Sequence, residues 1–408
     1  MPVDFTLSPE VEEVRLRVRK FMDEEVRPIQ DTLRGAGADR RAYVEQIVKL
    51  RQRAKEVGIW NPHLPAEWGG MGLGPVAMAF VSAEAGRTGG IGPYIINAQA
   101  PDEGNMHTLL HWGTPEQKEK YLRPLAEGRV RSCFAMTEPE VAGSDPTLIQ
   151  TTAVRDGDDW VLNGHKWFSS GAHGAAFAIV IACTDPDADP PQARNTGFIV
   201  ETPTEGWEIV RDVETMAGPA NHPEIRLTNV RVPVDNILGG RGDGHRLGQA
   251  RLGPARLAHC MRWIGQAEVA LEMLVDRALK RYAHGSYLAE KQAIQWMMAE
   301  SAMELYTGKL MVLHAAYKIE KGLPFRQEVS MAKVHVANTL WRVIDRAIQV
   351  HGALGYSTDT PLADMMRTAR AARLADGADE VHMQTIARNV ISAYKKEGRT
   401  RSATGDLL

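Results

Sequence analysis

The sequence predicts a mostly α-helical protein with a small β domain in the middle of the chain. Apolar residues recur at helical spacing from Ser8 to about Arg131. Between about Ser132 and Gly240 the spacing falls towards two residues, which is typical of strands, and from Leu247 onward helical spacing returns. We therefore expect an N-terminal helical domain over residues 1–131, a small β-barrel-like middle domain over 132–241 and a C-terminal four-helix bundle over 242–408.

The N-terminal domain is predicted from a capping residue and from apolar spacing. Ser8 can accept a backbone hydrogen bond at the start of a helix, and Pro9 suits the first turn. The apolar residues that follow recur every three to five positions: Val11, Val14, Val18, Phe21 and Val26. A second helix is expected over 41–57 and a further one over 116–123, with the glycine-rich stretch 67–74 as a loop.

Short apolar runs separated by turn residues predict the strands of the middle domain. The run 160–162 leads into Asn163-Gly164, a dipeptide that favours tight turns, so we expect a hairpin that returns through 166–168. The acidic, proline-rich stretch 185–195 is expected to be a loop. Further strands are expected over 177–182, over 197–200 and around 225–230.

Three long apolar stripes predict the C-terminal bundle. Their members are Leu257, Met261, Ile264, Leu271, Leu274 and Ala278 on a first helix, Ile294, Met297, Met298 and Leu305 on a second, and Val336, Leu340, Val343 and Ala347 on a third. The methionines near the second stripe are expected to fill core space, since this side chain adapts to irregular gaps. They are Met297, Met298, Met303 and Met311.

The composition excludes several classes of protein. A chain of 408 residues with 44% apolar residues is long enough for two or three subdomains with sizeable cores. Its formal net charge of -3 gives no sign of nucleic-acid binding. No apolar run reaches the roughly 18 to 20 residues of a transmembrane helix, and the first residues do not resemble a secretory signal. Three widely spaced cysteines, Cys133, Cys183 and Cys260, predict neither disulfides nor a metal site, so we expect a cytoplasmic protein.

Two segments of the middle domain contain candidate ligand-binding residues. Residues 133–145 combine small side chains with hydroxyls, which allows a backbone to approach a polar ligand, although a surface turn would have the same composition. Residues 163–171 place Trp167 and Phe168 beside Ser169 and Ser170. These side chains could stack on a flat ring and hydrogen-bond its edge, or the aromatics could fill the β core.

The C-terminal part contains three more candidate segments. Arg281, His284 and Gln292 are expected along a helix, and Gln349 precedes the glycine-rich stretch 352–355. Such groups could bind phosphates and an adenine, or they could be solvated side chains and helix C-caps. Asp376 lies just before a helix predicted to run to Ile391. It is either a cap of that helix, as Asp379 could also be, or a general base placed by a turn.

Taken together and in this order, these segments resemble the acyl-CoA dehydrogenase family over nearly the whole chain. The closest resemblance is to the subfamily of human acyl-CoA dehydrogenase family members ten and eleven. It is carried by four stretches: Phe134-Ala-Met-Thr-Glu-Pro139, Lys166-Trp-Phe-Ser-Ser-Gly171, His259-Cys-Met-Arg262, and Arg373-Leu-Ala-Asp-Gly377 followed by Asp379-Glu-Val-His382. The resemblance implies a flavoprotein oxidoreductase of fatty acid metabolism and β-oxidation that assembles as a homodimer or homotetramer.

The resemblance also implies a role for each candidate residue. The residues implied at the flavin ring of FAD are Phe134, Met136, Thr137, Phe168, Ser169 and Ser170. Those implied at the FAD phosphates and adenine of a neighbouring subunit are Arg281, His284, Gln292, Gln349, Gly352 and Ala353. Ala378 and Glu380 would also bind the cofactor. Ser144, Arg256 and Gly377 would bind the acyl-CoA, with Ser144 between its chain and the FAD pyrophosphate, and Asp376 aligns with the catalytic carboxylate.

The chain departs from the commonest family pattern in two places. Most members have a glutamate where this chain has Asp376, and the shorter side chain occurs in the subfamily named above. Some relatives take the base from the position of Ala255, which supplies no carboxylate here. Glu140-Val141 makes the loop before Ser144 one residue longer than usual, which puts the contacts implied for Ser144 in doubt.

The implied reaction is the oxidation of an acyl-CoA to a trans-2-enoyl-CoA. Asp376 would remove the α-proton while the β-hydride passes to flavin N5, and an electron-transferring flavoprotein would accept the electrons. Three alternatives stay open: a flavin oxidase on the same scaffold, an enzyme that processes 4-hydroxyacyl-CoA together with a separate kinase, and a non-catalytic binding protein. The FAD content and the electron acceptor would separate them.

Overall fold

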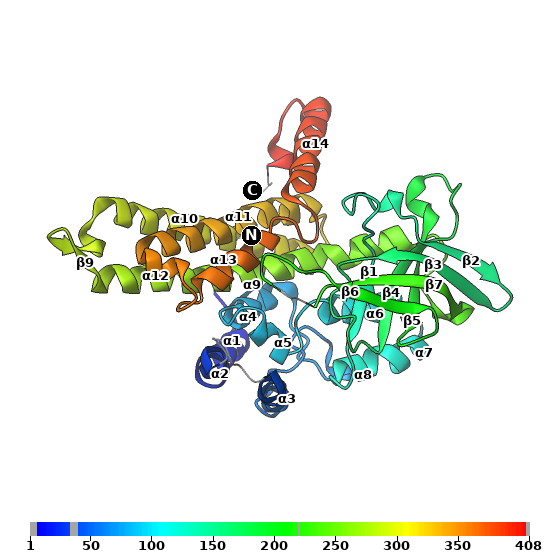
Figure 1. Cartoon of the computed structure of the whole chain (residues 1–408). Coiled ribbons are helices and arrows are strands. Elements are labelled where there is room, and N and C mark those ends of the chain that lie inside the picture. The colour runs from blue at the N-terminus through cyan, green and yellow to red at the C-terminus, as the bar shows by residue number, and fades with distance from the viewer. Residues whose placement is uncertain (1–5, 33–39, 219–220, 405–408) are drawn as a thin grey trace. The chain divides into compact units, whose positions relative to one another are not determined.

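The structure is a computed structural model that describes residues 6–32, 40–218 and 221–404. Its internal contacts divide the chain into two compact units. One unit consists of Met1–Pro65, Met71–Ala98 and Arg256–Leu408, and the other of Ala66–Gly70 and Gln99–Ala255. The predicted order of helices, then a sheet, then a helical bundle is confirmed (Figure 1). The domain boundaries at 131/132 and 241/242 remain a prediction.

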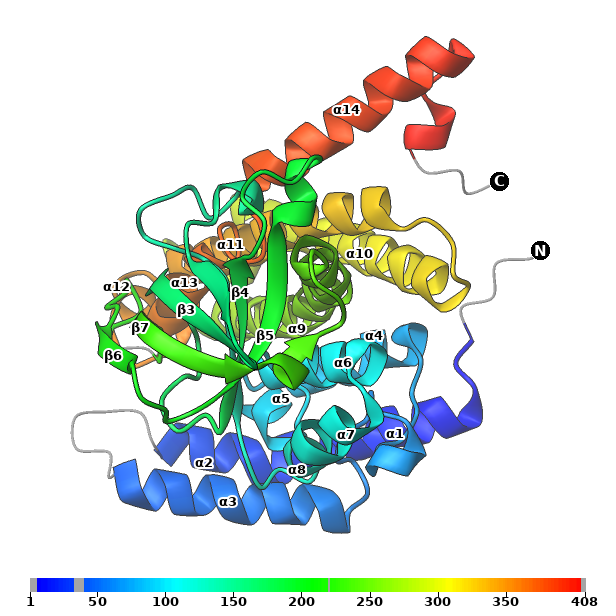
Figure 2. The same cartoon turned by 90° about the vertical axis from the view of Figure 1, so that its right-hand side faces the viewer.

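The unit that contains residues 99–255 is built on one mixed sheet (Figure 2). Its strands are β1 (Ser132–Ala135), β2 (Thr152–Asp156), β3 (Asp159–Lys166), β4 (Phe177–Cys183), β5 (Asn195–Glu201), β6 (Trp207–Asp212), β7 (Pro223–Pro233) and β8 (Ile237–Leu238). The strand order is β6-β7-β3-β2-β4-β5-β8, and β1 pairs in parallel with β4. Among the described residues the end strands β6 and β8 do not pair with each other, so the sheet is open rather than closed into the expected barrel.

The hairpin predicted at Asn163-Gly164 is wrong. β3 runs through both residues without a turn. The chain turns before β3 instead, at Gly157, between β2 and β3, where φ is +60°. Asn163 and Gly164 instead form an irregularity in the pairing of β3 with β7. The Asn163 side chain exchanges hydrogen bonds with Asn229, and a Cβ on Gly164 would lie 2.2 Å from Thr151 Oγ1. The dipeptide therefore forms a bulge in the strand and allows a close approach between two segments. Its sequence does not distinguish this use from a turn.

The core of this unit lies on β4 and its neighbours. Phe177 to Ala182 are all buried, as expected for a central strand, and Trp160 meets Phe198 edge-on with ring centroids 5.7 Å apart. Short helices complete the unit: α6 (Asp102–Trp112), α7 (Pro115–Gln117), α8 (Arg123–Ala126) and the π-helical turn Lys118–Leu122 between the last two. Asn105 of α6 donates a hydrogen bond to the Cys133 carbonyl at 3.1 Å, which attaches this helix to β1.

The other unit is helical. Its helices are α1 (Pro9–Phe21), α2 (Arg27–Thr32), α3 (Arg40–Glu56), α4 (Pro75–Gly86), α5 (Ile91–Ile95), α10 (Gln292–Glu320), α11 (Arg326–His351), α12 (Ala353–Tyr356), α13 (Leu362–Ala371) and α14 (Asp379–Glu397). It also includes the part of α9 (Gly244–Lys280) that follows Ala255. The predicted start of α1 is confirmed, because Ser8 Oγ accepts a hydrogen bond from the Val11 amide and Pro9 occupies the first turn.

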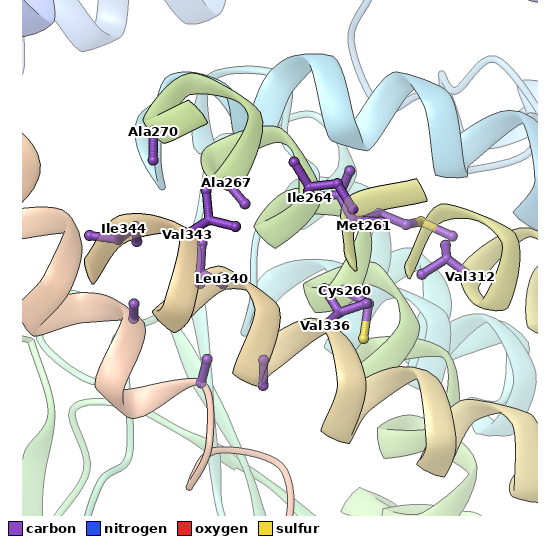
Figure 3. Packing of buried hydrophobic residues seen from close by; sticks show 14 of the residues in the cluster. Cys260, Met261, Ile264, Ala267, Ala270, Val312, Val336, Leu340, Val343 and Ile344 are labelled. Atoms are coloured by element: carbon purple, nitrogen blue, oxygen red, sulfur yellow. The ribbon is translucent and has the colours of Figure 1, made fainter. Parts of the chain in front are cut away.

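The bundle core forms where α9, α10 and α11 meet. In Figure 3 Ala267 of α9 lies near Leu340 and Val343 of α11, and Met261 of α9 lies near Val312 of α10. Of the four methionines predicted to fill the core, Met297, Met298 and Met311 pack partly buried against this cluster. Met303 is 62% exposed, because it does not lie on the buried face of α10, to which Ser301 and Leu305 belong. Within the described part of the chain, no helix is long and apolar enough to span a bilayer.

Gly164→Ala tests the close approach in the sheet. The added methyl group would meet Thr151, which is 1% exposed and whose hydroxyl also donates to Glu138 at 2.6 Å. Overpacking a filled site costs roughly 1–3 kcal/mol, so we expect a loss of that size in the free energy of unfolding, measured by denaturant titration. Val154→Ala, at a position 63% exposed on β2, should change it by less than about 0.5 kcal/mol. Equal stability of Gly164→Ala and wild type would contradict this account of the bulge.

Candidate functional site

Asp376 lies in the turn between α13 and α14 with a backbone conformation that is uncommon for residues other than glycine. Its φ is +55°, in the left-handed region, and Gly377 follows with φ +107°. The interpretation of Asp376 or Asp379 as a helix cap is wrong: α14 begins at Asp379, and Ala378 occupies the capping position without a side-chain hydrogen bond. A strained turn at a carboxylate that caps nothing is typical of a functional position.

Two cationic side chains bind the backbone of this turn. Arg256 Nε of α9 donates to the Asp376 carbonyl at 2.6 Å, and Lys333 Nζ of α11 donates to the Gly377 carbonyl at 2.7 Å. The Lys333 side chain is fully buried, and burial lowers its pKa, an effect that the nearby Asp379 opposes. Burial also lowers the pKa of Arg256 from its high ordinary value, again against the influence of Asp376.

Asp379 supplies the counter-charge for this arrangement. Its carboxylate accepts hydrogen bonds from Arg373 at 2.8 Å and from Asn338 at 2.9 Å, and it lies 3.5 Å from Lys333 Nζ. Burial alone would raise the pKa of Asp379, but these hydrogen bonds and the charge of Lys333 bring it below the ordinary value. Asp379 therefore stays ionised and balances the buried lysine.

His382 packs directly beneath the turn. Its Nε2 lies 3.4 Å from the Asp376 carbonyl, and its Nδ1 lies 3.2 Å from Ser330 Oγ. Burial, together with the charges of Arg256 and Lys333, lowers the pKa of His382 to about 4, so the ring is neutral at physiological pH. A Cβ on Gly377 would lie 2.8 Å from His382 Nε2, so this packing leaves space for glycine alone.

The Asp376 carboxylate lies close to a histidine of α9. Its side chain is 24% exposed, and its Oδ2 lies 3.2 Å from His259 Nε2 of α9. His259 was part of the motif that carried the family resemblance, yet sequence reasoning assigned it no role. The signal that could have identified it is its position three residues after Arg256, which places both side chains on one face of α9.

The predicted ring-binding residues follow β3 in the other unit. Phe168 has φ +49° and a side chain 43% exposed, with Trp167 edge-on at 5.1 Å between ring centroids. Ser170 Oγ lies 2.7 Å from His222 Nδ1, whereas the buried Ser169 Oγ has no hydrogen-bond partner among the residues the structure describes. An exposed aromatic ring next to an unsatisfied buried hydroxyl is suited to a flat ligand with polar edges.

A buried ion pair joins the 134–138 segment to β3. Lys166 Nζ donates to the Met136 carbonyl at 3.0 Å and to Glu138 at 2.8 Å, and both side chains are almost wholly buried. Burial lowers the pKa of Lys166 to about 8 despite Glu138. One residue further on, Thr137 and Trp167 exchange two hydrogen bonds of 2.9 and 3.1 Å. Thr137 and Phe168 are thereby held on adjoining segments.

Two other predicted residues of this unit have different surroundings. The ring of Phe134 lies under the Arg251 guanidinium, with 4.1 Å between the guanidinium carbon and the ring centroid. Ser144 is exposed in the loop that precedes the short turn Pro146–Leu148.

Of the residues predicted to lie along one helix, Gln292 is on a helix, whereas His284 is on a β-hairpin and Arg281 precedes that hairpin. The strands β9 (Tyr282–Ala283) and β10 (Ser286–Tyr287) pair, and His284 and Gly285 form their turn with φ +48° and +83°. Positive φ at both positions is the signature of a two-residue hairpin turn. Arg281 precedes the hairpin and Gln292 starts α10, and the hairpin lies at the end of the bundle away from α14 (Figure 1).

The remaining predicted residues are at helix ends. Gln349 is exposed in the last turn of α11, Gly352 ends that helix with φ +65°, and Ala353 begins α12. This confirms the C-cap interpretation of Gly352. Glu380 lines a groove of about 620 Å³ between α10, α11 and α14, next to Arg373 and Asp379.

The chain resembles proteins of one family along most of its length. Models of the N-terminal, middle and C-terminal domains of acyl-CoA dehydrogenases match residues 8–129, 133–230 and 242–391. The probable acyl-CoA dehydrogenase FadE2 of Mycobacterium tuberculosis is 41% identical over 96% of this chain and 98% of its own. The human acyl-CoA dehydrogenase family member 11 is 36% identical over 94% of this chain, which spans 50% of that longer protein.

A solved structure agrees with the sequence relatives. A putative acyl-CoA dehydrogenase from Mycobacterium abscessus matches 96% of this chain and 100% of its own, with a TM-score of 0.90 and 39% identity. The resemblance inferred from the four sequence stretches is thus confirmed. This chain belongs to the acyl-CoA dehydrogenase family, whose members are FAD-binding oxidoreductases.

Proposed function

We propose that this chain uses FAD to oxidise an acyl-CoA thioester to a trans-2-enoyl-CoA, with Asp376 as the general base. The observation that carries the proposal is the turn at Asp376. This aspartate has a left-handed backbone conformation, and its backbone carbonyl accepts a hydrogen bond from Arg256. The backbone of this turn is fixed through the carbonyls of Asp376 and Gly377, to which Arg256 and Lys333 donate.

The surroundings of Asp376 suit a base that removes a proton from carbon. An α-proton of a thioester is a weak acid, and a solvated carboxylate is a poor match for it. The Asp376 side chain is three-quarters buried, and an apolar acyl chain bound beside it would exclude more water. Removing water disfavours the ionised form of a carboxylate and makes it a stronger base.

The residues around Phe168 fit the flavin ring of FAD. Phe168 offers an exposed aromatic face, and the buried Ser169 hydroxyl has no partner among the described residues. The Thr137 segment is fastened beside them by the Lys166–Glu138 pair. Phe134, Met136, Thr137, Phe168, Ser169 and Ser170 would hold the ring, and the bound cofactor would accept the β-hydride of the substrate.

Arg256 has a role in this scheme beyond the one predicted from sequence. Its Nε is committed to the Asp376 carbonyl, while a guanidinium carries four further N–H donors. The predicted contact with CoA would use those donors, so Arg256 would link the substrate to the turn of the base. Ser144 and Gly377 remain proposed substrate contacts.

The exposed candidates at the far end of the bundle fit a contact with a second copy of the chain. Arg281, His284, Gln292, Gln349 and Ala353 are all exposed. We assign them, with Gly352, to the phosphates and adenine of FAD in a neighbouring subunit of a homodimer or homotetramer. Ala378 and Glu380 would also contact the cofactor.

Asp376→Asn tests the proposed base. The amide has nearly the same shape but cannot accept a proton, so we expect retained FAD and at least a ~100-fold slower flavin reduction under anaerobic single-turnover conditions. Asp364→Asn, an exposed carboxylate on α13, should leave the rate unchanged. A rate in Asp376→Asn equal to that of the wild type would remove Asp376 from the mechanism.

Phe168→Ala tests the proposed flavin site. The purified protein should be yellow, and loss of the stacking ring should weaken FAD binding by about tenfold in a fluorescence titration of the apoprotein. Val210→Ala, a partly exposed apolar residue on β6, is the matched control and should bind FAD as the wild type does. A colourless protein that takes up no FAD on reconstitution would refute the proposed function.

The electron acceptor separates a dehydrogenase from an oxidase on the same scaffold. We expect enzyme reduced anaerobically with an acyl-CoA to be reoxidised faster by an electron-transferring flavoprotein than by dissolved oxygen. Stopped-flow absorbance of the flavin measures both rates on the same sample. Faster reoxidation by oxygen, with hydrogen peroxide as product, would favour the oxidase.

A further inference from the structure

A single histidine contacts both a hydroxyl and an aromatic ring of the proposed flavin site. His222 lies just before β7, and its Nδ1 is hydrogen-bonded to Ser170 Oγ at 2.7 Å. The His222 ring also packs against the Phe168 ring, with 5.7 Å between centroids and 42° between planes. All three residues belong to the same compact unit. The sequence motifs include Phe168 and Ser170 but not His222.

Backbone hydrogen bonds place His222 directly opposite Ser170. The amides on either side of Ser170 donate to the carbonyls on either side of His222. These hydrogen bonds are Ser169 to Pro223 at 3.1 Å and Gly171 to Asn221 at 3.2 Å. The His222 carbonyl in turn accepts from the Val213 amide at 3.1 Å, which holds the His222 segment from its other edge. The contact between the two side chains is therefore set by the backbone.

Both groups of this pair can donate or accept a hydrogen bond. Burial lowers the pKa of His222, an effect that the nearby Asp212 opposes, so the neutral ring prevails at physiological pH. A neutral imidazole carries its proton on one nitrogen, and a hydroxyl has one proton and two lone pairs. If Nδ1 donates, the Ser170 O–H is free for a ligand, and if Nδ1 accepts, Ser170 Oγ offers a lone pair. The contact fixes the hydroxyl yet leaves it able to bind either kind of partner.

The ring and the hydroxyl beside His222 remain accessible to a ligand. Phe168 is 43% exposed, and Ser170 is half-buried. The two residues lie on one tight turn, since Phe168 has φ +49° and the Ser170 amide donates to the Phe168 carbonyl at 2.9 Å. A ligand that stacks on Phe168 and bonds to Ser170 would meet two groups that the same imidazole contacts.

We infer that His222 is a positioning residue of the proposed flavin site: its Nδ1 holds the Ser170 hydroxyl and its ring supports Phe168, so that a hydrogen-bonding group and a stacking ring keep one relative position. This inference rests on the proposed function, and His222 acts through these two neighbours. A flavin ring is rigid, so its face and its polar edge have a fixed relation. A site whose matching groups are held in advance loses less side-chain entropy on binding.

A second histidine near the same turn provides the matched control. His173 lies three residues after Ser170, its side chain is 49% exposed, and its Nε2 lies 3.1 Å from Asp212 Oδ2. His173→Phe therefore removes a nearby imidazole and leaves the hydrogen bond between Ser170 and His222 in place.

Two substitutions separate the hydrogen bond of His222 from its packing. His222→Phe keeps a flat ring beside Phe168 but offers nothing to the Ser170 hydroxyl. His222→Asn keeps an amide near the position of Nδ1 without the ring. Ser170→Ala breaks the same hydrogen bond from the other side. The thermal midpoint of each apoprotein is measured first, and His222→Leu replaces the phenylalanine variant if that protein does not fold.

The readouts are the affinity for FAD and the visible absorption spectrum of the bound flavin, neither of which requires turnover. In a fluorescence titration of the apoprotein, His222→Phe should bind FAD about fivefold more weakly than the wild type, which corresponds to one hydrogen bond. Its bound flavin should absorb closer to free FAD, because hydrogen bonds at the ring edge shift the flavin bands. His222→Asn should keep the wild-type spectrum and an affinity within about threefold, and His173→Phe should match the wild type in both.

A double variant tests whether the two residues act through one contact. His222→Phe combined with Ser170→Ala should bind FAD no more weakly than the weaker of the two single variants. Additive losses would contradict the inference, because they would show that His222 does not act through the Ser170 hydroxyl.

The outcomes distinguish this inference from the proposed function. If the wild type takes up no FAD, or if Phe168→Ala binds FAD as the wild type does, the proposed flavin site fails. If Phe168→Ala binds FAD more weakly while His222→Phe matches the wild type in affinity and spectrum, the proposed function stands and the inference is overturned. Equal losses in His222→Phe and His222→Asn would also overturn it, because retention of the hydrogen-bonding group would then have no effect.

Discussion

The proposed role of Asp376 depends on how the backbone carbonyls of Asp376 and Gly377 are held. Asp376 and Gly377 both have positive φ, which costs energy for the aspartate, and the turn persists because Arg256 and Lys333 donate to their carbonyls. Burying a lysine is costly in turn, and Asp379 compensates its charge while Arg373 and Asn338 satisfy the carboxylate. The strain at one residue is thus offset by a network that draws on α9, α11, α14 and the turn before α14.

The sheet unit uses a similar device for its ligand-facing segments. Lys166, on β3, is buried with Glu138 and donates to the Met136 carbonyl, so an ion pair helps to hold residues 136–138, which follow the end of β1. Removing one partner of such a pair would leave an uncompensated charge, at a cost of about 3–5 kcal/mol. In both units a buried lysine fixes backbone beside candidate site residues.

Local signals in the sequence were enough for much of the fold. The Ser8 cap, the long apolar stripes of the bundle and the buried strand β4 depend on neighbours in the chain or on simple periodicity, and they were predicted. Asn163-Gly164 failed because the same dipeptide suits a turn and a bulge, and only the approach of Thr151 decides between them. The prediction of a helix through Arg281 and His284 failed for a similar reason, since a two-residue hairpin turn interrupts a stretch whose sequence suggests a continuous helix.

The candidate site shows the same limit. Sequence motifs identified Asp376 but left its role open between a helix cap and a general base. Because α14 starts at Asp379, Asp376 is not a cap of that helix. The contact of His259 with the Asp376 carboxylate joins residues 117 positions apart, and the local signal for it is only the spacing of His259 from Arg256 on α9. A crystal structure with FAD and a 3-thia-acyl-CoA bound tests the central claim most directly. We predict an Asp376 carboxylate oxygen within about 3–3.5 Å of the α carbon; a carboxylate turned away from that carbon, with another base in its place, would contradict it.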